Sequence, residues 1–374
     1  MKLTLKIKLL PSKEQADLLL QTIKEANVVC NTISETAWEK KVFNQFKIHN
    51  EVYHTLKGSS NLSAQVLVRC ISKVADAYKL DRKTKRTFKP LGSIAYDSRI
   101  LSYKGDTVSI WSVGGRLKVP FVCHNHNYLP YIKGEADLLY RKGKFYLFQT
   151  VDVVEDDVKD IETFLGVDFG LVSLATLSNG KEFNSKKLQD YREKRQKVRS
   201  SVQSKCTRNS KKLLKRLSGR ERTHASITNH TIAKQIVAIA KEENKGIALE
   251  DLKGIRFSSL KKGKKFRSRV GKWSFNQLRN YIAYKSALAG IPVVLVEPRY
   301  TSKTCSNCHH VGNRQGKKFE CHNCGNNMDA DVNASRNIAT LGCSVNNSEK
   351  SDMYSCTVHY SDLKPIPSAL AVGG

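Results

Sequence analysis

The sequence lacks any run of about eighteen apolar residues and has no apolar core near its start, which excludes a predicted membrane span and a secretory signal. Acidic residues are scarce, because 34 Asp and Glu stand against 64 Lys and Arg. The ten cysteines give no disulfide pattern, since four are clustered and six are scattered along the 374 residues. We therefore expect a cytoplasmic protein of two or three domains.

The excess of basic residues gives a formal net charge of +30 and indicates a polyanionic partner. Such a charge favours contacts with phosphate groups that release condensed counterions. An anionic membrane surface is the competing partner, but the sequence contains no amphipathic anchor to support it. Nucleic acid is therefore the predicted partner, and no membrane association is expected.

One segment concentrates this charge, with fifteen Lys and Arg against three acidic residues between positions 186 and 222. A solvated helix usually mixes the two signs more evenly, so we interpret the segment as a phosphate-contacting surface. A second basic segment, 261–272, is interpreted in the same way. The candidate contact residues are Lys194, Arg195, Lys197, Arg199, Lys211, Lys212, Lys215, Arg216, Lys264 and Lys265.

Periodicity divides the chain into regions of different character. Alternating apolar residues predict a strand over 3–9, and Ser12 with Gln15 has the form of a capping box that begins a helix. A second helix is predicted over 62–78. Short β-rich runs between 92 and 153, separated by turn residues, are typical of a small antiparallel sheet or barrel. From about 161 onward, strands alternate with helices, which predicts an α/β sheet.

Four cysteines have the spacing of a zinc ribbon: Cys305-x2-Cys308-x12-Cys321-x2-Cys324. Each Cys-x-x-Cys turn offers two thiolates to one side of a tetrahedral ion. Nearby histidines leave the exact ligand set open, although four cysteines already satisfy one zinc. A redox dithiol would need only one such pair, so we predict one structural zinc ion.

Three carboxylates occur where buried strands end or helices begin. Asp168 ends an apolar strand, Glu250 ends the short strand Gly-Ile-Ala-Leu, and Asp329-Ala-Asp331 precedes a helix predicted over 334–339. A buried carboxylate is costly unless it is paired or bound to metal. Together, the three positions indicate a divalent-cation site, and carboxylate oxygens suit Mg²⁺.

The motifs around these residues resemble those of the TnpB proteins, which are encoded by bacterial and archaeal insertion sequences and are compact relatives of type V CRISPR nucleases. The resemblance rests on Gly-Val-Asp168-Phe-Gly, on Ala-Leu-Glu250-Asp-Leu, and on the ribbon followed by Asp329-Ala-Asp-Val-Asn-Ala-Ser-Arg-Asn-Ile338. The start, Leu10-Pro-Ser-Lys-Glu-Gln15, is also similar. Two positions depart from the family pattern: His309 stands where Gly is common, and Ser335 where Ala is usual.

The resemblance implies a multidomain fold of α/β and β parts. An RNase H-like RuvC nuclease domain with an inserted zinc ribbon would follow a wedge β-barrel and a helical recognition lobe. The expected boundaries are 1–10 for the first barrel strand, 11–89 for the lobe, 90–157 for the barrel, 158–300 for the nuclease with a basic helical insertion at 184–240, 301–327 for the ribbon, 328–340 for the rest of the nuclease, and 341–374 for a disordered tail.

The activity that the resemblance implies is RNA-guided cleavage of double-stranded DNA beside a short adjacent motif, with a guide made from the transposon end. Asp168, Glu250 and Asp331 would hold two catalytic Mg²⁺ ions, and Asp329 would be a supporting partner. Asp331 is preferred as the third acid because it belongs to the Asp-x-Asn-Ala element. A bacterial or archaeal nucleoid-associated location follows. The alternatives are a nuclease-inactive RNA-guided repressor, a CRISPR-associated type V effector and a transposase.

Overall fold

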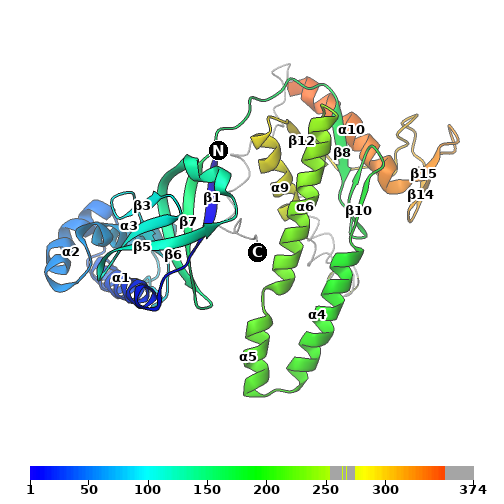
Figure 1. Cartoon of the computed structure of the whole chain (residues 1–374). Coiled ribbons are helices and arrows are strands. Elements are labelled where there is room, and N and C mark those ends of the chain that lie inside the picture. Colours follow the sequence, from blue (N-terminus) through cyan, green and yellow to red (C-terminus); the bar gives the residue numbers. More distant parts are fainter. Residues whose placement is uncertain (253–262, 264–266, 268–273, 350–374) are drawn as a thin grey trace. The chain divides into compact units, whose positions relative to one another are not determined.

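A computed structural model describes residues 1–252, 263, 267 and 274–349 (Figure 1). The predicted contact residues Lys264 and Lys265 lie outside the described residues. The chain divides into two compact units, Met1–Val153 and a second unit that begins at Val154. Across the described ranges, no helix combines the length and apolarity needed to cross a bilayer.

The first unit contains three helices, which are α1 (Lys13–Glu39), α2 (Gln45–Ser59) and α3 (Ala64–Leu80). The predicted capping box is confirmed, because the Ser12 hydroxyl accepts from the Gln15 N–H and the Gln15 side chain accepts from the Ser12 N–H. Sequence analysis did not predict α2, whose buried residues Ile48, Val52 and Leu56 form a narrow apolar stripe. The helices α1 and α3 pack through residues that are almost fully buried, including Ile23 and Ile71.

The sheet of the first unit has seven antiparallel strands in the order β2-β6-β7-β1-β5-β4-β3. It curls into a near-barrel, since the Tyr103 hydroxyl on β3 donates to the buried Gln149 side chain on β7, 3.0 Å away. The predicted β-rich region is confirmed. A 3₁₀ turn, His126–Tyr131, precedes β6. The strands are β1 (Lys2–Leu9), β2 (Ile94–Tyr96), β3 (Leu101–Lys104), β4 (Thr107–Ser112), β5 (Gly115–Cys123), β6 (Ile132–Arg141) and β7 (Lys144–Asp152).

The second unit is built on a mixed five-stranded sheet in the order β10-β9-β8-β11-β12. The first three strands along the chain pair antiparallel, and β11 and β12 join them in parallel. The central strands are apolar up to the acid that ends each of them, as expected where helices cover a sheet. The strands are β8 (Phe164–Asp168), β9 (Ser173–Leu177), β10 (Glu182–Asn184), β11 (Gly246–Glu250) and β12 (Val293–Val296).

Helices of two kinds accompany this sheet. The helices α6 (Arg220–Glu242) and α9 (Phe275–Leu288) lie side by side and pack through buried apolar residues (Figure 1). The helices α4 (Lys186–Ser204) and α5 (Arg208–Leu217) each bury a single residue, so most of their surface faces solvent. The strongly basic segment of the sequence therefore forms an exposed helical pair.

Between β12 and the last helix, α10 (Ala330–Glu349), the chain forms a three-stranded antiparallel sheet. Its strands are β13 (Asn313–Gln315), β14 (Lys318–Glu320) and β15 (Asn327–Asp329). Phe319 on β14 is fully buried between cysteines of the ribbon. The predicted ribbon region therefore has its own small core.

Helix α10 packs directly against β8 and is longer than the sequence predicted. The expected disordered tail is wrong for 341–349, which continue the helix; the rest of the tail, 350–374, lies outside the described residues. The helix continues because several of its residues pack on the sheet, although the composition of this segment is rich in Ser and Asn. Gly342 lies against Ala248 and Phe164, and Cys343 and Val345 pack on the same cluster.

The closest contact between sheet and helix occurs at Gly166 of β8. A Cβ there would lie 1.9 Å from the carbonyl oxygen of Ser335 and 2.6 Å from the backbone nitrogen of Ala339. Both atoms belong to the backbone of α10, so no side-chain rotation relieves the clash. Only glycine permits this approach of helix to strand.

We expect Gly166→Ala to destabilise the second unit by about 3 kcal/mol, because the added methyl group forces α10 away from β8. Differential scanning calorimetry measures the effect. The matched control is Gly58→Ala in α2, where nothing lies within 4 Å of the added Cβ. The control should be neutral or stabilising by up to about 1 kcal/mol. An unchanged transition in Gly166→Ala would contradict the packing described here.

Candidate active site and metal centre

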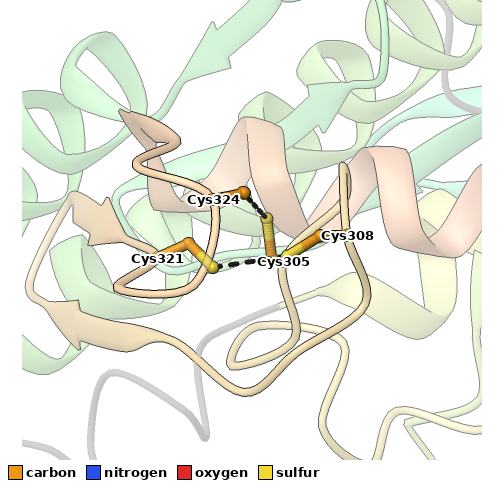
Figure 2. A group of neighbouring side chains, drawn as sticks. All are labelled: Cys305, Cys308, Cys321 and Cys324. Carbon is orange, nitrogen blue, oxygen red and sulfur yellow. Dashed lines mark hydrogen bonds between the residues drawn. The ribbon is translucent and has the colours of Figure 1, made fainter.

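Four cysteine thiols converge in the ribbon (Figure 2). The Sγ atoms of Cys305 and Cys324 lie 3.7 Å apart, and those of Cys308 and Cys321 lie 3.5 Å apart. A tetrahedral zinc ion with Zn–S bonds of about 2.3 Å requires sulfur atoms about 3.8 Å apart. The four ligand atoms all lie within 4.8 Å of one another, so the donor set and its spacing fit one zinc ion.

The surroundings favour the thiolate form of Cys305 and Cys308, whose pKa values are lowered, whereas the pKa of Cys324 is raised to about 11. A hydrogen bond from the His310 backbone, followed by one from the Asn323 side chain, lowers the pKa of Cys308 to about 5. In the described part of the chain, the group whose ligand atoms converge consists of the four cysteines and includes no histidine. His309 adopts a positive φ of 61°, the conformation for which glycine is the ordinary residue.

Asp168 and Glu250 stand at the same edge of the mixed sheet. Strands β8 and β11 are parallel neighbours in which Leu249 pairs with Val167, so Glu250 follows beside Asp168. Neighbouring strands lie about 4.8 Å apart, and equivalent residues in parallel register point to the same face. The carboxyl ends of parallel strands are where open α/β sheets bind ligands.

Asp331 reaches the same edge through the contact between Gly166 and α10. Along β8, Asp168 is two residues beyond Gly166 and therefore on the same face of the sheet. Along α10, Asp331 is four residues before Ser335 and therefore on the same face of the helix. Because Gly166 lies against Ser335, Asp168 and Asp331 lie on the faces of strand and helix that meet at this contact.

The electrostatics of the three acids agree with this arrangement. Burial, followed by the neighbouring charges of Glu250 and Asp331, raises the pKa of Asp168 from 3.8 to about 8. Burial also raises the pKa of Glu250, which is only 7% exposed. Acids whose pKa values are raised by burial and by neighbouring charge are candidates for a functional site.

Two neighbouring side chains moderate this charge, and sequence analysis missed both. The Thr301 hydroxyl donates to Oε1 of Glu250 over 2.7 Å. The Arg314 guanidinium, on β13 of the ribbon, donates through Nη2 to Oδ1 of Asp331 over 2.7 Å. Both contacts join residues far apart in the sequence, so spacing alone gives no signal for them.

Asp329 has a structural task, because its Oδ1 accepts from the backbone N–H groups of Asp331 and Val332 at 2.9 and 3.1 Å. It thereby caps the start of α10. This role favours Asp331, rather than Asp329, as the acid that faces the sheet. The hydroxyl of Ser335 is satisfied within the helix by the carbonyl of Val332, so its departure from the family pattern leaves the packing intact.

Buried asparagines of α10 hold the base of the ribbon. The Asn333 side chain accepts from the Ser306 N–H at 2.9 Å and donates to the Thr304 carbonyl at 2.7 Å. One turn later, the Asn337 side chain donates to the carbonyls of Thr301 and Thr304. The zinc ribbon is therefore attached to the helix that carries Asp331 and to the threonine that bonds Glu250.

The three acids are close enough to interact but are not a closed metal cage. Over the described residues, the four cysteines are the one group of three or more His, Cys, Asp or Glu side chains whose ligand atoms lie within 4.8 Å. Their assignment as metal ligands therefore stays a prediction. Glutamate, aspartate and threonine oxygens at one sheet edge nevertheless suit a hard cation that keeps part of its water shell.

The predicted nucleic-acid contacts that the structure describes lie on α4 and α5. Seven of these eight side chains are exposed, and Arg195 is half-buried. Arg195 and Arg199 line an open cavity of about 480 Å³, together with Leu214 and Leu217 of α5. The two helices thus carry a basic, exposed surface with an open cavity, although its contacts with nucleic acid remain a prediction.

One comparison with known proteins matches the part of the chain that carries the ribbon and Asp331. The family model described as "Cas12f1-like, TNB domain" matches residues 275–338, which span α9, the ribbon and the first turns of α10. The chain is 34% identical over 151 residues to the TnpB-like protein MJ0751 of Methanocaldococcus jannaschii, an alignment that covers 40% of this chain and 54% of that protein.

Two further relatives are similar over other lengths. The CRISPR-associated endodeoxyribonuclease Cas12f1 of Sulfoacidibacillus thermotolerans is 41% identical over 116 residues, 30% of this chain and 26% of that protein. InsQ of Escherichia coli, whose name includes the words RNA-guided DNA endonuclease, is 31% identical over 227 residues, 54% of this chain and 55% of that protein. The chain thus spans about half or less of the length of each relative.

The raised pKa of Asp168 predicts how stability depends on pH. Between pH of about 4 and 8 the folded protein keeps the proton on Asp168 whereas the unfolded chain releases it, so stability falls as pH rises through this window. Asp168→Asn removes that loss, and without added magnesium the variant should exceed the wild type by at least about 1 kcal/mol at pH 8. Urea unfolding at several pH values measures the difference. Parallel pH curves for the two proteins would contradict the shift.

Proposed function

We propose that this chain, which belongs to the family of TnpB-like and Cas12f proteins, is an RNA-guided endonuclease that cleaves double-stranded DNA. The observation that carries the proposal is the meeting of Asp168, Glu250 and Asp331 at one edge of a mixed sheet. The names of similar proteins, which include endodeoxyribonuclease and RNA-guided DNA endonuclease, agree with it.

The donor set suits magnesium as the catalytic cofactor. The three carboxylates supply hard oxygen ligands, and the upward pKa shift of Asp168 reflects burial and then the neighbouring charges of Glu250 and Asp331, which a divalent ion would relieve. When bound, two such ions supply an activated water and stabilise the leaving oxygen of a phosphodiester. The three acids would hold the ions, as in a RuvC-like nuclease, the domain type that we assign to the second unit.

The protein's own groups prepare this site. Thr301 orients Glu250 by donating to one carboxylate oxygen, which leaves the other free of that bond. Asp329 fixes the first turn of α10 and so the direction of Asp331. Burial raises the pKa values of Asp168 and Glu250, and the positive charge of Arg314 partly offsets this rise. Arg314 would also face an incoming phosphate group.

The basic surface of α4 and α5 would contact the nucleic-acid backbone. The exposed lysines and arginines of these helices would attract phosphate groups electrostatically and without regard to base sequence, which supplies most non-specific affinity. In the proposed division of labour, guide pairing reads the target sequence, and the protein holds the backbone. The guide would come from the transposon end, and cutting would occur beside a short adjacent motif.

The zinc ribbon would have a structural role in this mechanism. It is anchored to α10 through Asn333 and Asn337, and its β13 strand carries Arg314. The zinc site lies in the segment that joins Glu250 to Asp331 along the chain. We infer that folding of the ribbon brings the third carboxylate to the first two.

The experiment is cleavage of double-stranded DNA by protein purified with its co-expressed guide RNA and supplied with magnesium. Asp168→Ala should reduce cutting by at least about 1,000-fold, because the metal ligands act as a unit. Binding of RNA and DNA should remain within about twofold of the wild type. Exposed Asp156 in the segment before β8 gives the matched control Asp156→Ala, which should cut normally.

Each component of the proposal can fail separately. Undiminished cutting by Asp168→Ala would remove the catalytic assignment. Cutting that needs no RNA would keep a nuclease but exclude guidance. A wild-type complex that binds both nucleic acids without cutting would identify an RNA-guided binding protein instead.

A further inference from the structure

The tip of the ribbon hairpin, residues 314–317 from the middle of β13 to the residue before β14, is attached at two points. On one side, Arg314 forms its ion pair with Asp331 of α10. On the other side, the Lys317 ammonium lies 3.0 Å from Oε1 of Glu182 on β10. These contacts bridge 17 and 135 residues of sequence, so they connect the tip to two elements that the ribbon itself does not contain.

Glu182 and Lys317 belong to a network that reaches the loop after Asp168. Ser173, the first residue of β9, donates its hydroxyl to Glu182 and accepts from the Lys317 ammonium at 3.4 Å. The loop between Asp168 and Ser173 is tight, because a Cβ on Gly170 would lie 2.7 Å from the Ser173 carbonyl oxygen. The lysine is therefore tied to the strand that directly follows the first catalytic acid.

The backbone adds a third attachment at the same point. The carbonyl of Lys317 accepts from the N–H of Ala330, the first residue of α10, over 2.8 Å. The tip thus touches β9, β10 and the start of the helix that carries Asp331. Arg314 stands three residues before Lys317, so the position of the lysine limits where the guanidinium can lie.

The ion pair is poorly suited to stabilise the fold, because its side chains are 47% and 40% exposed and such pairs contribute little to stability. The location of the pair, which attaches the hairpin tip beside the three acids, explains its charges better. A cation bound by Asp331 would weaken the attraction of this carboxylate for Arg314, which would then be freer to move. A second attachment at Lys317 would keep Arg314 beside the acids during that movement.

We propose that Lys317 and Glu182 are positioning residues of the nuclease site, which hold the ribbon tip so that Arg314 faces the three carboxylates. The proposal rests on the proposed nuclease function. It assigns the pair no contact with the reacting atoms. The role requires only that the two residues carry opposite charges, and it is indifferent to which of them is the cation.

A charge exchange tests this property. Lys317→Glu and Glu182→Lys should each lower the rate constant of DNA cleavage by about tenfold, because small displacements of catalytic groups have effects of this size or larger. The double variant, which restores an attractive pair, should recover most of the rate. The exposed ribbon residue Lys303 provides the control Lys303→Glu, with the same change of charge and no expected effect.

Hydrogen exchange supplies a readout that does not depend on activity. Backbone amides of 314–317 should exchange several-fold faster in each single variant and return to the wild-type rate in the double variant. Zinc content should remain one ion per chain in all of them. This measurement remains informative even if the wild type proves not to be a nuclease.

The outcomes separate the possibilities. Single variants that cut and exchange like the wild type would overturn the proposal. Slow single variants without recovery in the double variant would also overturn it, since they would indicate that Lys317 contacts nucleic acid directly. A wild type that does not cleave under any condition would refute the proposed function, whereas altered exchange with recovery would still support the attachment of residues 314–317 by Lys317 and Glu182.

Discussion

The site depends on one contact, the approach of α10 to β8 at Gly166. Because the strand residue has no side chain, the helix backbone lies directly on the sheet, with the Ser335 carbonyl where a Cβ would otherwise stand. This contact fixes the register of helix against strand. Asp168 lies two residues after Gly166 on the strand, and Asp331 lies about one helical turn before Ser335. The contact at this glycine therefore determines how two acids far apart in the sequence are placed relative to each other.

The arrangement is costly for the fold and useful for chemistry. Burial disfavours the charged forms of Asp168 and Glu250, and the neighbouring charges of Glu250 and Asp331 add to the effect at Asp168, as the raised pKa values show. A protein selected for stability alone would replace such acids or pair each with a cation. Here one cation, Arg314, bonds Asp331 and acts on Asp168 and Glu250 only through its charge. A divalent ion would neutralise the negative charge that remains.

The sequence revealed the parts that local patterns encode: the cysteine spacing, the acids that end apolar strands, and the capping box at Ser12. It missed α2, whose apolar stripe of Ile48, Val52 and Leu56 is short, and it ended α10 too early because packing by Cys343 and Val345 outweighs a polar composition. The contacts of Thr301, Arg314 and Lys317 were also missed. They join residues 51, 17 and 135 positions apart, and only the folded chain brings such pairs together.

The central claim is that three acids from β8, β11 and α10 form one divalent-cation site in a protein that holds zinc elsewhere. The most direct measurement is a Mn²⁺ titration of the zinc-loaded protein, followed by electron paramagnetic resonance, for the wild type and for Glu250→Gln. We predict that the wild type binds Mn²⁺ and that the variant loses this binding while its zinc content stays the same. Equal Mn²⁺ binding by the two proteins would contradict the account.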